Sequence, residues 1–151
     1  IKIDKKKFKI IFSFLYKIKK KGLKLKKIKI YYISIMVNMH LDTIYFDYIK
    51  NGIKKYETRV YDPKRQKIQL LEEVIFSDRG SKRKFKARIT ELAWFPNFKE
   101  AIEPVGIKKV LPNVRSLADG VKTYEAFPHD EGNYKKGAKK YGVLRMKFTL
   151  I

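Results

Sequence analysis

Residues 45–68, "YFDYIKNGIKKYETRVYDPKRQKI", give the clearest indication of the fold expected for this chain. Its first part has the spacing of a short helix, and Asn51-Gly52 supplies the left-handed turn that commonly ends one. The next part, "KKYETRVY", alternates as a strand does, so residues 54–61 are predicted to be extended. Asp62-Pro63 should end this strand and open a single helical turn. A helix followed at once by a strand therefore begins the predicted domain.

Turn residues and hydrophobic periodicity divide the rest of the chain into short elements. The first helix should start at Asp42 or Thr43 and bury its apolar residues at helical spacing, Ile44, Tyr45, Tyr48 and Ile49. The elements expected after residue 68 are a buried strand (73–77), a hairpin turn (78–82), a return strand (84–90), two helices (97–106 and 116–127, the second capped by Ser116 and Asp119) and a closing strand (141–151). This order predicts an α+β fold, a small curved or barrel-like β-sheet with short helices on its rim.

Five charged residues of the opening stretch form the candidate site. Alternation puts Glu57 and Arg59 on one face of the strand, and Lys54 at its start can reach the same space. The two cations should lower the pKa of the Glu57 carboxyl, so that it acts as a base or accepts hydrogen bonds. Lys64 and Arg65 add positive charge beside it. The alternative is a salt bridge between Glu57 and Arg59 on a solvated face, and the local sequence leaves both interpretations open.

The composition limits the kinds of site that the chain can form. It has no cysteine and two histidines, His40 and His129, so we expect neither a metal site nor another cofactor. The absence of cysteine fits a reducing, intracellular (cytoplasmic) compartment. The net charge of +22 predicts anionic partners such as nucleic acid, and no segment is long and apolar enough to predict a membrane partner. The sequence leaves the oligomeric state open.

The positive charge is concentrated in a Lys/Ile-rich segment at the start of the chain, and we place its end at residue 38. Residues 1–35 carry thirteen Lys against one acid, a net charge of +12, which leaves +10 for the remainder. Two interpretations stay open: a basic arm that binds phosphates, or a non-native or disordered extension, which the narrow residue repertoire favours. Residues 10–16 are short for a signal peptide, and no small-residue cleavage site follows them. The domain proper is therefore expected over residues 39–151.

The residues of the opening stretch resemble a known family. The pattern G-x-K-x-x-E-x-R after a short helix is the hallmark of the ASCH domain, and it is matched by Gly52, Lys54, Glu57 and Arg59. The segments "SLADGVKTYEAFP" and "KKYGVLRMKFTLI" are similar to the last helix and the closing strand of that family. The resemblance covers about residues 39–151 and implies a PUA-like barrel.

For function, the resemblance implies a basic cleft beside the barrel that binds RNA or a modified nucleoside. Lys54, Glu57 and Arg59 would line this cleft. We expect Lys54, Arg59, Lys64 and Arg65 to contact phosphate or carbonyl groups, and Glu57 to accept from hydrogen-bond donors of the base. The alternative is a small hydrolase, amidohydrolase-like or a ribonuclease, with Lys54 and Glu57 as catalytic residues.

The chain departs from the family pattern at two places. Some bacterial members deacylate a modified cytidine with a Lys, a Thr three positions later and a Glu elsewhere; this chain has the Lys at Lys54 but Glu57 in the Thr position. Many members have a Gly-Asp turn where this chain reads Leu71-Glu72-Glu73, so a modified turn is expected there. A hydrolase would need a further acid, for which the candidates are Glu91, Glu100 and Glu103.

Three features outside the motif have alternative interpretations. Residues 82–88, "KRKFKAR", could follow a phosphate backbone, or their lysines could protect an exposed edge strand. Trp94 is expected in the core, and stacking on a base is the alternative. His129 lies in a polar segment and is expected to be exposed.

Overall fold

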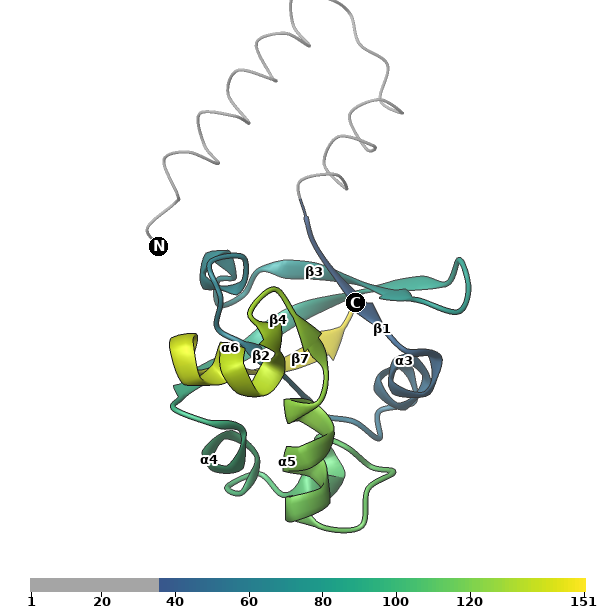
Figure 1. The fold of residues 1–151 in the computed structure, drawn as a ribbon. Helices are drawn as coiled ribbons and strands as arrows, with labels where there is room; N and C mark the ends of the chain where they lie inside the picture. Colours follow the sequence, from purple (N-terminus) through teal and green to yellow (C-terminus); the bar gives the residue numbers. More distant parts are fainter. Residues whose placement is uncertain (1–35) are drawn as a thin grey trace, which may run out of the picture. The chain divides into compact units, whose positions relative to one another are not determined.

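A curled five-stranded sheet organises residues 36–151, the part of the chain that the computed structural model describes (Figure 1). The strands follow the order β1-β3-β4-β7-β2; β1 and β3 are parallel and the other pairs are antiparallel. Their bounds are β1 Val37–Leu41, β2 Tyr56–Val60, β3 Glu73–Asp78, β4 Lys84–Phe95 and β7 Val143–Leu150. The edge strands β1 and β2 do not pair with each other within these residues, so the sheet is a half-barrel. This architecture confirms the predicted α+β class.

Short helices connect the strands of the described part. They are α3 Thr43–Lys50, α4 Phe98–Ile102, α5 Leu117–Glu125 and α6 Tyr134–Tyr141, with 3-10 turns η1 at Arg65–Lys67 and η2 at Ile107–Lys109. A two-stranded ladder, β5 Pro128–His129 with β6 Gly132–Asn133, precedes α6. Figure 1 shows α4, α5 and α6 gathered together, while α3 lies apart from them beside β1. Across residues 36–151, no helix has the length and apolar character needed to cross a bilayer.

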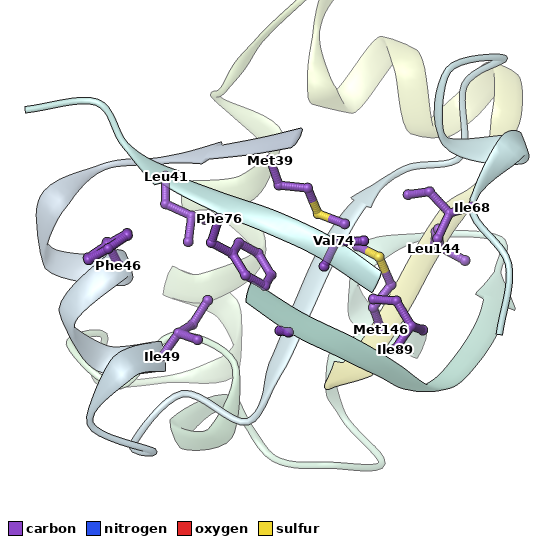
Figure 2. Packing of buried hydrophobic residues seen from close by; sticks show 11 residues of the cluster. Met39, Leu41, Phe46, Ile49, Ile68, Val74, Phe76, Ile89, Leu144 and Met146 are labelled. Atoms are coloured by element: carbon purple, nitrogen blue, oxygen red, sulfur yellow. The ribbon is translucent and has the colours of Figure 1, made fainter. Parts of the chain in front are cut away.

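The sheet and α3 enclose the first of two apolar clusters. Figure 2 shows side chains from β1, α3, β3, β4 and β7 converging on one another. The buried members are Met39, Leu41, Phe46, Ile49, Ile68, Val74, Phe76, Ala87, Ile89, Leu144 and Met146. Each fully buried Leu, Ile, Phe or Met side chain contributes about 1.5–3 kcal/mol relative to exposure. Burial of this set therefore holds β1, an edge strand, against the rest of the sheet.

The second apolar cluster joins α4, α5 and α6 to the other end of the sheet. Its buried members are Val60, Phe98, Ala101, Ile102, Val110, Leu111, Tyr124, Tyr134, Ala138 and Val143. The Phe98 ring stacks against the rings of Tyr124 and Tyr134, at centroid distances of 5.1 and 5.9 Å. Because Val60 lies on β2, this cluster fixes the second edge strand and the tyrosines beside it.

Most predicted elements are confirmed. The first helix starts at Thr43 directly after Asp42, and Gly52 follows it with a φ of +70°. The strand at 73–77, the hairpin, the two later helices and the closing strand lie where expected, and Ser116 Oγ accepts from Asp119 N at 3.1 Å. The inward face of α3 differs from the prediction, because Phe46 is buried whereas Ile44 is exposed.

Other expectations differ from the structure. Residues 82–88 form an edge strand only in part, because residues 84–88 pair with β3 while β7 pairs with β4 only from Ala87 onward. Trp94 is 56% exposed instead of belonging to the core; its Nε1 donates to Tyr141 O at 3.1 Å and its ring lies on Gly142. β1 and α6 were not predicted. The lysine-rich residues 1–35 lie outside the described residues.

Candidate functional site

A pocket of about 130 Å³ lies where the two edge strands of the half-barrel come together. One wall comes from β1 and the start of α3, and the opposite wall comes from β2. Arg59 joins these walls, since its Nη2 donates to the backbone oxygen of His40 at 3.0 Å. The lining residues are His40, Leu41, Asp42, Tyr45, Lys54, Glu57, Arg59, Arg79, Leu111, Tyr124, Phe127, Pro128 and Tyr134. The pocket therefore contains Lys54, Glu57 and Arg59, three of the residues predicted from the sequence.

Glu57 is the buried acid of the pocket, only 3% exposed. Its Oε1 accepts hydrogen bonds from Thr58 N at 2.9 Å and from the Tyr124 hydroxyl at 3.1 Å. Lys54 Nζ lies 3.7 Å from Oε1, and Arg59 Nη2 lies 3.7 Å from Oε2. Oε1 is thus held by the protein, whereas Oε2 has only the Arg59 ion pair among the contacts found within residues 36–151.

Lys54 lies in the loop just before β2 and is also buried. Its Nζ donates to Val110 O at 2.5 Å and to the Tyr124 hydroxyl at 3.2 Å. The Tyr124 hydroxyl therefore accepts from Lys54 and donates to Glu57, which links the two charges. These contacts come from α5 and from the segment after η2, more than fifty residues along the chain.

Burial and charge shift the titration of this cluster in different directions. Burial lowers the pKa of Lys54 to about 8, despite the opposing charge of Glu57. Burial alone would raise the pKa of Glu57, but the positive charges of Lys54 and Arg59 and the two hydrogen bonds to Oε1 bring it below its ordinary value. Burial also raises the pKa of Tyr124 well above its ordinary value. At neutral pH the pocket therefore holds an ionised carboxylate between two cations.

Aromatic rings and one ion pair complete the pocket. Its aromatic residues are Tyr45, Tyr124, Phe127 and Tyr134. Asp42 and Arg79, which form an ion pair of 3.1 Å with both side chains more than half exposed, stand at its rim. Aromatic faces, a carboxylate and guanidinium groups together suit a flat, polar ligand.

Lys64 and Arg65 line a second cavity of about 140 Å³ rather than the first. His40, Arg59 and Arg79 line both cavities, so the two lie next to each other along β1. The five predicted site residues are thus divided between two neighbouring cavities, with Arg59 common to both.

Three expectations about the site are corrected. The interpretation of Glu57 and Arg59 as a solvated salt bridge is wrong, because the Glu57 carboxylate is buried and accepts from Tyr124 of α5. None of the three candidate acids lines either cavity: Glu91 pairs with Arg145 at 3.0 Å, and Glu100 and Glu103 lie on or beside α4.

His129 is the third correction, since its side chain is 6% exposed and its Nε2 lies 3.1 Å from Asp62 Oδ2. Asp62 also accepts from Arg65 Nη1 at 2.8 Å, so this buried carboxylate ties the 3-10 turn η1 to the β5–β6 ladder. The described residues contain no group of three or more His, Cys, Asp or Glu side chains that could hold a metal ion.

Sequence reasoning missed several residues of the pocket. Tyr124 and Tyr134 fall on helices whose spacing also suits a purely apolar face, so nothing marks their hydroxyl or ring as part of a site. His40 and Asp42 belong to β1 and the residue after it, an element that was not predicted. Asp42 lies directly before the motif helix, and this position could have indicated that it belongs to the pocket.

Fold and pocket together define a small α+β half-barrel domain with a ligand-sized pocket at the opening of its sheet. The ASCH domain model matches residues 39–151, and the chain belongs to this family. It is similar to the crystal structure of hypothetical protein PH0355, with 36% identity, a TM-score of 0.64, and coverage of 78% of this chain and 100% of that one. It is also similar to the solution NMR structure of protein PF0455 from Pyrococcus furiosus, with 31% identity, a TM-score of 0.59, and coverage of 78% and 98%. Comparison with curated proteins gives no match.

Proposed function

We propose that the pocket between β1 and β2 binds one base of an RNA or a modified nucleoside. The observation that carries this proposal is the ionised Glu57 carboxylate, buried among aromatic side chains in a pocket. A carboxylate in such a place accepts hydrogen bonds from the amino or ring N–H groups of a base edge. Because Oε1 already accepts two bonds from the protein, Oε2 is the atom that would read the base.

The size and lining of the pocket support the same ligand class. Its volume of about 130 Å³ is well below the roughly 300 Å³ or more of sites for drug-sized ligands, so it suits a single ring system. Tyr45, Phe127 and Tyr134 offer ring surfaces on which a base can stack. Arg59 keeps further N–H donors for a carbonyl oxygen of the base.

Affinities of the full chain for the four ribonucleosides and an N4-acylated cytidine test this proposal. Neutral nucleosides are the right probes because they are not attracted by the lysines of residues 1–35. Glu57→Ala should abolish discrimination between bases. The matched control is Glu91→Ala, which also removes a strand glutamate paired with an arginine but lies outside the pocket. Absence of nucleoside binding, or equal effects of the two substitutions, would refute the proposal.

RNA-binding measurements test whether the pocket or the overall positive charge accounts for most of the affinity for RNA. The chain of residues 36–151 and the full chain should both bind RNA. Glu57→Ala should relax sequence preference, whereas Lys64→Ala should mainly flatten the salt dependence. Binding by the full chain alone, with a steep salt dependence that ignores both substitutions, would assign RNA binding to the lysines of residues 1–35.

The second candidate function is that of a small hydrolase, and the pKa of about 8 for Lys54 favours it. An amine with this pKa is partly neutral near physiological pH and can accept or donate a proton, while ionised Glu57 can activate a water molecule. Neither cavity is lined by Ser, Thr or Cys, so neither holds an aliphatic hydroxyl or a thiol as a nucleophile. Release of the acyl group from an N4-acylated cytidine, abolished by Glu57→Gln, would support the hydrolase; no turnover of acylated or phosphodiester substrates would exclude these reactions.

A further inference from the structure

The second cavity, lined by Lys64 and Arg65, has a chemistry different from that of the first. Its lining contains four cations, Arg59, Lys64, Arg65 and Arg79, and no carboxylate. The other lining residues are Val37, Asn38, Met39, His40 and Ile68. Four positive side chains around a hollow of about 140 Å³ favour a compact anion with several acceptor oxygens.

The cations of this cavity are only partly neutralised. Arg59, Arg65 and Arg79 pair with Glu57, Asp62 and Asp42, at 3.7, 2.8 and 3.1 Å. Each of these pairs joins one terminal nitrogen of a guanidinium to one carboxylate oxygen, and a guanidinium carries five N–H donors. Lys64 has no ion-pair partner among the described residues. The cavity therefore keeps a positive charge and several hydrogen-bond donors for a ligand.

Arg59 fixes the relation between the two cavities. Its Nη2 donates to His40 O and faces Glu57 at the first cavity, while the same side chain also lines the second. His40, Arg59 and Arg79 line both cavities, so the two lie next to each other beside β1. A flat polar group next to a compact anion is the pattern of a nucleotide.

We propose that the second cavity binds a phosphate group, so that the ligand is a nucleotide, either free or within an RNA strand, rather than a free nucleoside. This inference rests on the proposed function, because it takes the first cavity as the base site. Lys64 and Arg65 are then specificity-determining residues for the phosphorylated ligand, and Arg59 serves both parts of it. Asp62 is a positioning residue, because it accepts from Arg65 N at 3.0 Å and from Arg65 Nη1 at 2.8 Å.

The test compares a nucleoside with its 5′- and 3′-monophosphates on the full chain, by calorimetry at two salt concentrations. At least one monophosphate should bind about tenfold more tightly than the nucleoside, the effect of one charge-assisted hydrogen bond. Lys64→Ala and Arg65→Ala should remove this gain, so that the monophosphate binds no more tightly than the nucleoside. Lys67→Ala is the matched control: this lysine ends the same 3-10 turn, is exposed and does not line the cavity.

The outcomes separate this inference from the proposed function. Equal affinity for the nucleoside and both monophosphates would overturn the phosphate site and leave the base site standing. A phosphate gain that Lys67→Ala lowers as much as Lys64→Ala does would also overturn it, because general surface charge would then be the cause. Failure of every nucleoside to bind would overturn the proposed function itself, whatever the monophosphates do.

Discussion

The buried charge cluster predicts a specific and large loss of stability on Glu57→Gln. The glutamine oxygen can still accept from Thr58 N and the Tyr124 hydroxyl, so the substitution removes little besides the negative charge. Each ion pair spans 3.7 Å, which corresponds to about 4.5 kcal/mol of Coulomb attraction at an effective dielectric constant of roughly 20. Part of this attraction is offset, because a neutral glutamine avoids the desolvation cost of a buried carboxylate. We therefore expect a net loss of stability of about 3–5 kcal/mol, the usual cost of leaving buried charge unpaired.

The pH dependence of this loss has a defined sign. Folding lowers the pKa of Glu57 below its ordinary value of 4.5, so its charge stabilises the fold above that pH and the contribution is lost as pH falls. Folding lowers the pKa of Lys54 to about 8, so Lys54 is charged beside Glu57 only below about pH 8. The difference between wild type and Glu57→Gln should therefore be largest between about pH 5 and 8. Above pH 8 it should shrink by roughly half, because the Arg59 pair alone remains.

Urea unfolding of the full chain at about pH 6.5 and about pH 9 measures both effects. The control is Glu91→Gln, which breaks a single 3.0 Å pair with Arg145 at a glutamate that is more than a third exposed. It should cost less than Glu57→Gln, because only one ion pair is lost and Arg145 keeps its hydrogen bond to Ala101 O. A Glu57→Gln loss no greater than that of Glu91→Gln would contradict the account of the cluster. An equal loss at both pH values would contradict the role of Lys54.

Three further substitutions test other parts of the structure. Leu71 is exposed and has a φ of +65°, a conformation that favours glycine. In urea unfolding, the Leu71→Gly variant should therefore be more stable than the Leu70→Gly variant by about 1 kcal/mol, and the reverse order would refute strain at the turn. Gly142→Ala should cost about 1–3 kcal/mol more than Gly106→Ala, because both glycines have a positive φ but only at Gly142 would a Cβ overlap the Trp94 ring. Equal losses would show that Trp94 moves freely. Tyr124→Phe should lower the stability by about 1–3 kcal/mol and weaken nucleoside binding, since it removes the hydroxyl that links Lys54 to Glu57. Unchanged stability and affinity would exclude this link.

Much of the fold could be predicted from local sequence, because turns and helix caps depend on neighbouring residues. Gly52 adopts the expected left-handed conformation after α3, and Ser116 caps α5 through Asp119. The sequence also showed the departure from the family's Gly-Asp turn at Leu71, and the structure places this residue in the conformation that glycine favours. The helix α6 escaped prediction because its eight residues bury little apolar surface, chiefly Tyr134 and Ala138.

The features of the site that could not be predicted from the sequence depend on burial by residues far away along the chain. Alternation assigns Glu57 and Thr58 to opposite faces of β2 but does not say that other elements cover both faces, and both residues are buried. Lys54 needs acceptors at Val110 and Tyr124, which are 56 and 70 residues away. In the same way, His129 lies in a polar segment, yet its contact with Asp62 across 67 residues buries it.

NMR titration of the full chain with a ribonucleoside would show whether the pocket between β1 and β2 is the ligand site. Changes in the backbone amide signals should be confined to residues that line the pocket or contact it, among them His40, Glu57, Thr58, Tyr124 and Phe127. Signals of Arg88 and Trp94, on β4 and outside both cavities, should stay constant. Changes centred on residues 82–88 or on the lysine-rich segment, with none at Glu57 and Thr58, would contradict the account.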